Sequence, residues 1–160
     1  MRIWAWHMIR FGAEHFSKIF VGLIFSIGAA QADSWSAFEQ RCLIPFEHQS
    51  LSDISGLEAV HSENGLKRYE IIQPDGETLE LELEDGPDDG LRACTVSEQS
   101  PSALADFEVW IAAMVADERY IEVEEGRWQS NYWIEPVLEI QLLQRGDALG
   151  LRIVETDLES

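Results

Sequence analysis

The chain has 160 residues and a formal net charge of −19, from 30 acidic and 11 basic side chains. This excess of negative charge repels nucleic acid and anionic lipid headgroups, so it argues against a nucleic-acid-binding protein. Hydrophobic residues make up 46% of the chain, which favours a folded core over a disordered acidic protein.

Residues 1–32 have the pattern of a secretory signal peptide. Three basic residues precede an apolar run at 19–30, and Ala30-Gln31-Ala32 is a cleavage site of small residues. The run is shorter than the about 20 residues of a spanning helix, so an uncleaved membrane anchor is the weaker alternative. Met8 is an alternative start to Met1 and would give a signal of more ordinary length.

The remaining chain, 33–160, is predicted to be a single domain of a periplasmic or secreted protein. Residues 1–32 hold three of the basic and one of the acidic side chains. Residues 33–160 therefore keep 8 basic and 29 acidic side chains, a formal charge of −21. A domain this acidic attracts basic proteins or divalent cations; acidity that serves only solubility is the alternative.

Both cysteines, Cys42 and Cys94, lie in the part predicted to be exported. Two cysteines in an oxidising compartment predict one disulfide. The bond would close a loop of 52 residues, and chain-entropy arguments assign about 4 kcal/mol of stability to a loop of this size. A reactive thiol at Cys94 is the alternative, although the chain contains no C-x-x-C pair.

The first half of this domain predicts one helix and four strands. Trp35, Phe38 and Cys42 lie at helical spacing, which predicts a helix over 35–43 that Pro45 ends. Turn residues, among them Asn64-Gly65 and Pro74-Asp75-Gly76, separate the strands predicted at 57–61, 66–73, 77–84 and 91–97. In the third strand Leu79, Leu81 and Leu83 should face a core, while Glu80, Glu82 and Glu84 face water.

The second half repeats that order with a longer helix. Ser100 can cap a helix that begins with Pro101 and extends to residue 117. Its apolar face is predicted to consist of Leu104, Phe107, Ile111, Met114 and Val115. Four strands are predicted after it, at 119–124, 127–134, 137–144 and 149–155.

The order helix, four strands, helix, four strands predicts an α+β fold. Short connections favour a mostly antiparallel sheet, as one sheet or two, with the two helices packed on one side and one disulfide. Ala37-Phe38-Glu39 and Asp106-Phe107-Glu108 are weakly alike, which leaves an internal repeat as an open alternative.

The chain carries no zinc-hydrolase, nucleophile-elbow, phosphate-loop or dinucleotide-binding motif, and the sequence predicts no catalytic residue, metal or cofactor. Glu47, His48 and Ser50 are the nearest approach to a catalytic group, but they lie together in one predicted loop.

An acidic run is predicted to be a solvated surface, with calcium binding as the weaker alternative because the spacing does not match an EF-hand. Its residues are Glu80, Glu82, Glu84, Asp85, Asp88 and Asp89. Arg145-Gly146-Asp147 is predicted to be a hairpin turn.

The densest aromatic group after residue 32 is formed by Arg127, Trp128, Tyr132 and Trp133. Trp and Tyr are enriched at binding surfaces, because each combines a large apolar body with a polar tip. A strand with aromatic residues on both faces cannot bury both against one core, so we interpret this group as the candidate binding surface. Burial of both faces, one under the helix and one under loops, is the alternative.

The segments at 38–45 (FEQRCLIP), 90–96 (GLRACTV) and 126–137 (GRWQSNYWIEPV) resemble small exported proteins of unknown function from alphaproteobacteria. The resemblance spans most of the chain after residue 32 and agrees with the two-cysteine pattern. It implies no activity.

The sequence therefore predicts an exported, non-catalytic binding domain with a basic protein as its partner. An acidic inhibitor of a cationic envelope or extracellular protein is one form of this function. A small hydrolase with a site near His48 and a structural envelope protein without a specific ligand are the alternatives. Neither nucleic acid nor a stable membrane anchor after cleavage is expected, and the oligomeric state is left open.

Overall fold

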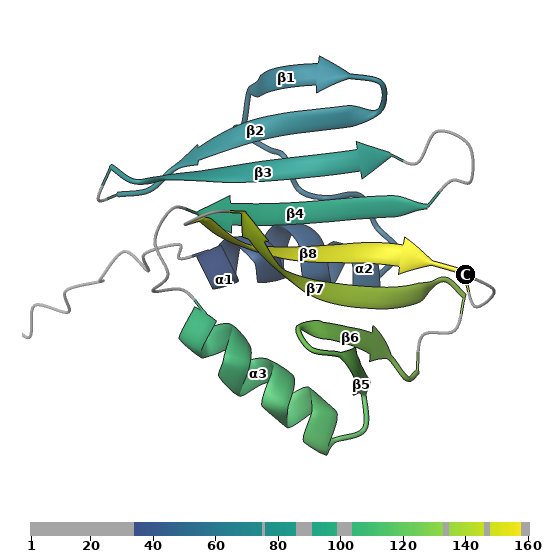
Figure 1. The fold of residues 1–160 in the computed structure, drawn as a ribbon. Coiled ribbons are helices and arrows are strands. Elements are labelled where there is room, and N and C mark those ends of the chain that lie inside the picture. Colours follow the sequence, from purple (N-terminus) through teal and green to yellow (C-terminus); the bar gives the residue numbers. More distant parts are fainter. Residues whose placement is uncertain are drawn as a thin grey trace, which may run out of the picture.

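The computed structural model describes residues 34–74, 76–85, 91–98, 104–132, 135–145 and 148–157. They form one eight-stranded sheet with helices packed against one of its faces (Figure 1). The predicted signal peptide at 1–32, the alternative start Met8, and the cap formed by Ser100 and Pro101 lie outside these residues. In the described part of the chain, no helix is long and apolar enough to cross a membrane.

Helical segments and strands follow one another in two series. The helical segments are α1 (Ser34–Phe38), η1 (Glu39–Leu43), α2 (Ile44–Glu47) and α3 (Leu104–Ala116). The strands are β1 (Ala59–Glu63), β2 (Leu66–Ile72), β3 (Thr78–Asp85), β4 (Arg92–Glu98), β5 (Tyr120–Glu124), β6 (Arg127–Ser130), β7 (Val137–Arg145) and β8 (Ala148–Thr156).

The α+β class and the antiparallel pairing are confirmed, but two finer predictions are wrong. The helix count differs, because the first predicted helix is three consecutive segments. The strands are also not arranged in chain order, since the sheet has the order β1-β2-β3-β4-β8-β7-β6-β5. A separate second sheet is not formed either, because β4 pairs with β8 and joins the two series edge to edge.

The first helical region continues past its predicted end. The prediction that Pro45 ends this helix is wrong, because Pro45 lies inside α2, which extends to Glu47. Proline has no N–H to donate to the carbonyl of Arg41, and the preceding turn is wide, with the N–H of Ile44 reaching back to Glu39. The predicted inward face of this region is buried: Trp35, Phe38 and Cys42.

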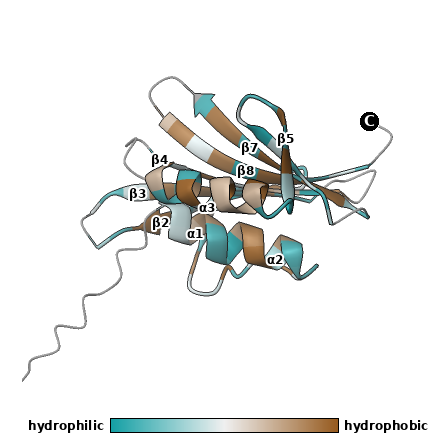
Figure 2. Ribbon diagram, turned by 90° about the horizontal axis from the view of Figure 1, so that it is seen from below, coloured by the Kyte–Doolittle hydropathy of each residue, from teal (hydrophilic) through white to brown (hydrophobic). Residues whose placement is uncertain are grey.

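A single hydrophobic core lies between the sheet and the helices. Alternate residues of the central strands point into it, as the period-two pattern predicted, and the best-buried are Leu79, Leu81, Cys94, Val96, Leu138, Ile140, Leu151 and Ile153. Figure 2 shows α1 and α2 on one side of the sheet, while β7 and β8 curve toward the other side. The face opposite the helices, here called the open face, carries the other half of the alternating side chains.

Helix α3 covers the core with Phe107 and Ile111, as predicted. Val115 is exposed instead of buried. Trp110 takes part in its place, since its ring lies 5.2 Å from that of Trp35 and 5.6 Å from that of Tyr120. The face of α3 that meets the core therefore includes Trp110 and leaves out Val115.

The turn between β1 and β2 has the geometry that Asn64-Gly65 predicted. Asn64 has a φ of 50° and Gly65 a φ of 82°, the left-handed pair that a two-residue hairpin turn requires. A Cβ on Gly65 would lie 2.7 Å from the carbonyl oxygen of Asp85, whose N–H donates to the Gly65 carbonyl at 3.0 Å. The glycine thus permits both the turn and a close contact with β3.

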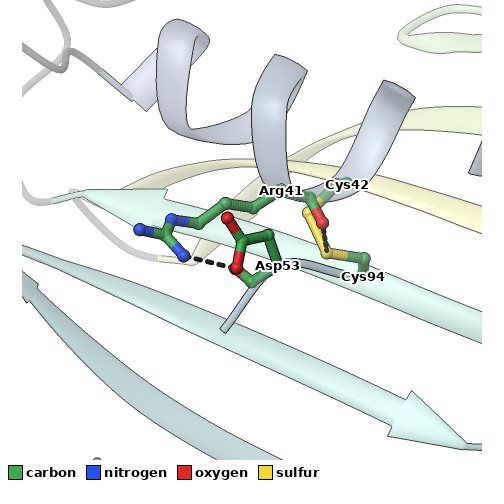
Figure 3. The surroundings of a disulfide bond; sticks show 4 residues. All are labelled: Arg41, Cys42, Asp53 and Cys94. Atoms are coloured by element: carbon green, nitrogen blue, oxygen red, sulfur yellow. Dashed lines mark hydrogen bonds between the residues drawn. A yellow bond between two sulfur atoms is a disulfide. The ribbon is translucent and has the colours of Figure 1, made fainter. Parts of the chain in front are cut away.

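The predicted disulfide joins Cys42 to Cys94, with their Cα atoms 5.5 Å apart (Figure 3). Both residues are fully buried, so the bond fastens η1 to the middle of β4 within the core. Arg41 beside it donates a hydrogen bond to the carbonyl of Asp53, which also ties the following loop to η1. The described residues contain no unpaired cysteine.

Replacing both cysteines with alanine is expected to lower the free energy of unfolding by about 4 kcal/mol, because the bond closes a loop of 52 residues in the unfolded chain. Urea unfolding of the wild type and the double variant measures the difference. Reductant should shift the midpoint of the wild type and leave the double variant unchanged. An unchanged wild-type midpoint would show that the bond is not formed in solution.

Candidate functional site

The aromatic group predicted as a binding surface is divided between two faces of the sheet. Trp128 points into the core side and packs edge-on against Phe107, with 5.4 Å between ring centroids. Arg127, the preceding residue, points to the open face and binds Glu139 and Glu124. Trp133 lies outside the described residues.

Tyr132 lies beyond the end of β6, which is shorter than the predicted strand. Its hydroxyl donates to the Glu47 carboxylate at 2.7 Å and accepts from Arg119 at 2.6 Å. Tyr120 donates to the same carboxylate oxygen at 3.3 Å, and its burial, followed by the charge of Glu47, raises its pKa. These contacts link Glu47 of α2 to Tyr120 of β5 and to Tyr132, so Tyr132 stabilises the fold.

The residues around His48 do not assemble a catalytic group. Glu47 is engaged by the two tyrosines, and the Ser50 hydroxyl donates to the Pro45 carbonyl at 3.4 Å. His48 is exposed at the end of α2.

The acidic run of β3 is neutralised by basic side chains of neighbouring strands. Glu82 and Glu80 lie 2.6 Å and 3.6 Å from Arg68, and Arg152 contacts Glu84 at 2.8 Å. Asp85 lies 3.6 Å from Lys67, while Asp88 and Asp89 are outside the described residues. No cluster of three or more metal-ligating side chains occurs among the residues that the structure describes.

One expectation about this strand is wrong, because Glu82 is 4% exposed. The Arg68 guanidinium of the neighbouring strand lies against it at 2.6 Å. Across the open face the register continues this charged row from Arg68 and Glu82 through Thr95, Arg152, Gln141 and Arg127.

Glu139 is the second buried carboxylate of the open face. Burial raises its pKa, but hydrogen bonds donated by Gln141, Arg127 and Gln129 outweigh burial and hold the pKa below its ordinary value. Gln129 is its direct register partner on β6 and donates to it at 3.1 Å. Glu139 is therefore a satisfied anion.

A pocket of about 400 Å³ opens on the same face, between residues of β2, β3 and β4 and residues of β7 and β8. Its middle contains small residues, since Ser97 of β4 is paired with Gly150 of β8. A Cβ on Gly150 would lie 3.2 Å from the Cβ of Ser97, so glycine allows these strands to meet here. The lining residues are Glu70, Thr78, Glu80, Thr95, Ser97, Glu98, Leu143, Ala148, Leu149 and Gly150.

One side of the pocket sets two like charges against each other. Glu70 of β2 is the direct register partner of Glu80 of β3, and like charges in that position destabilise a sheet. Within the described part of the chain the Glu70 carboxylate forms no ion pair or hydrogen bond. The Glu80 carboxylate lies 3.6 Å from the guanidinium of Arg68. The pocket therefore holds negative charge in excess.

Thr95 lines the inner part of the same pocket. It is 1% exposed, and its hydroxyl has no hydrogen-bond partner among the described residues. A buried hydroxyl without a partner costs free energy, so this atom is an unsatisfied polar group in the wall of the pocket.

No family model, curated protein or solved structure matches the chain. The candidate site therefore rests on the pocket alone. Sequence reasoning missed it because period-two alternation gives the face of each glutamate but not its partner strand. The one available signal was the hairpin of 66–84, whose turn predicts that Glu70 and Glu80 lie near each other.

Glu139→Gln is expected to lower the free energy of unfolding at neutral pH by about 2 kcal/mol, because hydrogen bonds to a buried charge are lost. The depressed pKa of Glu139 means that its stabilisation is complete above the ordinary carboxyl pKa of about 4.3 and is lost as the pH falls through the lower folded value. Urea unfolding from pH 7 to pH 3 should show the difference between wild type and variant narrowing below about pH 4. A constant difference would contradict the assignment.

Glu70→Gln is expected to raise the free energy of unfolding by about 0.5 kcal/mol, because it removes a like-charge pair across two strands. The variant reproduces the Gln129–Glu139 pairing that this sheet already contains. Glu108→Gln, an equal charge change on the exposed face of α3, is the matched control. Equal effects of the two variants would attribute the change to net charge.

Proposed function

We propose that this chain is a non-catalytic binding domain for a basic protein, and that the pocket on the open face receives a cationic group of that partner. The observation that carries the proposal is the register opposition of Glu70 and Glu80 in the pocket. A cation bound between them converts a repulsive contact into two attractive ones.

The charge of the whole chain supports this choice of partner. A net charge of −19 speeds the approach of basic proteins and disfavours acidic ones, while the pocket would decide which cationic group is accepted. Arg68, Arg127 and Arg152 do not oppose this, because each already contacts a carboxylate of the same face.

The disulfide supports an exported location, since such bonds persist in oxidising compartments. In the periplasm or outside the cell, an inhibitor of a cationic protein is one form of the proposed binding. A hydrolase centred on His48 has less support, because Glu47 is held by Tyr120 and Tyr132. A purely structural role does not account for the repulsion between the register partners Glu70 and Glu80.

Binding of a labelled basic peptide with mixed lysine and arginine, followed by fluorescence anisotropy, tests the proposal. Glu70→Gln is expected to weaken binding about fivefold, which corresponds to losing about 1 kcal/mol from a partly exposed charge contact. Glu108→Gln should bind like wild type, because it changes the net charge equally outside the pocket. Added salt should weaken every complex.

Equal weakening in Glu70→Gln and Glu108→Gln would contradict the pocket and leave only general attraction between opposite charges. Circular dichroism of each variant verifies that the fold is intact before the affinities are compared.

A further inference from the structure

We propose that the pocket on the open face is a site for an alkylammonium group, and that its natural occupant is a lysine side chain of the partner protein. This inference rests on the proposed function and specifies its ligand. Three features of the pocket carry it: the arrangement of its oxygen atoms, its apolar side, and the opposed charges of Glu70 and Glu80.

The oxygen atoms come from three neighbouring strands. Glu70 of β2 and Glu80 of β3 are direct partners, and Thr95 of β4 lies one register row away beside Glu82. Glu70 is exposed and Glu80 is partly exposed, while Thr95 is buried. Oxygen atoms from three neighbouring strands thus line the same pocket.

An ammonium group matches this arrangement better than a guanidinium group. It is a compact charge with three donors that point in separate directions, so it can reach two carboxylates and one hydroxyl together. A guanidinium donates within one plane, which suits a single carboxylate or two acceptors side by side. The Thr95 hydroxyl would remain without a partner beneath a bound arginine, with the cost of a buried unsatisfied group.

The other side of the pocket is mostly apolar. Leu143 of β7 and Ala148 and Leu149 of β8 line it, with Glu98 of β4 as the register partner of Leu149. A lysine carries four methylene groups between its backbone and its charge, and such a stem packs on apolar surface while the charge lies elsewhere. The pocket therefore presents the two halves of a lysine side chain with matching surfaces.

A lysine side chain fits better than a free polyamine. A polyamine carries further charges along its chain. Leu143 and Leu149 offer them no acceptor, and Glu98, the third carboxylate of the lining, already has an interaction of its own. A lysine on a protein has one charge, and its backbone stays outside the pocket.

Titration calorimetry with four probes tests the inference: a neutral peptide with one central lysine, the same peptide with acetyl-lysine, the same peptide with arginine, and spermidine. We expect the lysine peptide to bind about tenfold more tightly than the arginine peptide, the effect of one hydrogen bond to a charged group. Acetylation should abolish binding, and spermidine at equal concentration should not displace the lysine peptide.

Thr95→Val removes the buried hydroxyl and keeps the side-chain shape. It should weaken the lysine peptide about tenfold and leave the arginine peptide unchanged. Thr95→Ser restores a hydroxyl and should restore lysine binding. Since the hydroxyl has no partner in the described chain, Thr95→Val is expected to keep the melting temperature of the wild type.

Thr78→Lys provides a second test that does not depend on Thr95. Thr78 is exposed on β3, two residues before Glu80 and on the same face, so a lysine there can reach the pocket from within the chain. The variant should melt at a higher temperature and no longer bind the lysine peptide. Ala112→Lys on the exposed face of α3 is the matched control and should bind it.

The outcomes separate this inference from the proposed function. Equal affinity for the lysine and arginine peptides, with both weakened by Glu70→Gln, would overturn the ammonium site and leave a general cation pocket. Displacement by spermidine would overturn the lysine assignment in favour of a small polyamine. Lysine binding that is unaffected by Glu70→Gln would overturn both proposals.

Discussion

The pairing of β4 with β8 is the constraint on which the rest of this structure depends. It joins two series of four strands into one continuous sheet, so all the helices can share a single core on one face. The same junction determines both functional features of the fold. On the covered face it places Cys94, one half of the disulfide, beside Ile153, and on the open face it places Ser97 beside Gly150, in the pocket. A shift of one residue in this register would exchange the two faces.

Charge on the open face is arranged by strand neighbours. Carboxylates in the middle rows are buried because arginines and glutamines from adjacent strands lie over them, as Arg68 does with Glu82 and Gln129 with Glu139. This accounts for an open face that is charged and yet partly inaccessible to water. Where this face lines the pocket, Glu70 and Glu80 lie opposite each other, and among the described side chains Arg68 is the basic group that contacts Glu80.

The sequence contains the local features of this fold but not its long-range pairing. Alternating leucines in β3 and the Asn64-Gly65 turn predict elements correctly, because face and turn type depend on neighbouring residues. The β4–β8 junction could not be predicted, since strand periodicity does not identify a partner far along the chain. The prediction that the aromatic group forms one surface is wrong for a related reason. Strand β6 ends at Ser130, so the strand alternation that would place Trp128 and Tyr132 on one face does not extend to Tyr132. The burial of Glu82 depends on Arg68 of the adjacent strand and had no signal within its own strand.

The sheet provides its own comparison for the candidate site. Counted outward from the junction, β3 and β2 occupy the same places in one half as β7 and β6 in the other. In the second half, Glu139 is opposite Gln129, which donates a hydrogen bond to it, whereas in the first half Glu80 is opposite Glu70. The sheet thus pairs a glutamate with a glutamine in one half and with a second glutamate at the pocket.

Two like charges are retained at the pocket beside a buried hydroxyl that has no partner in the described residues, although a glutamine in place of one of them would remove the repulsion. Local instability concentrated in a pocket is typical of a site whose missing interaction is provided by a ligand. General acidity for solubility does not explain it, because exposed carboxylates placed elsewhere provide the same charge without opposing one another.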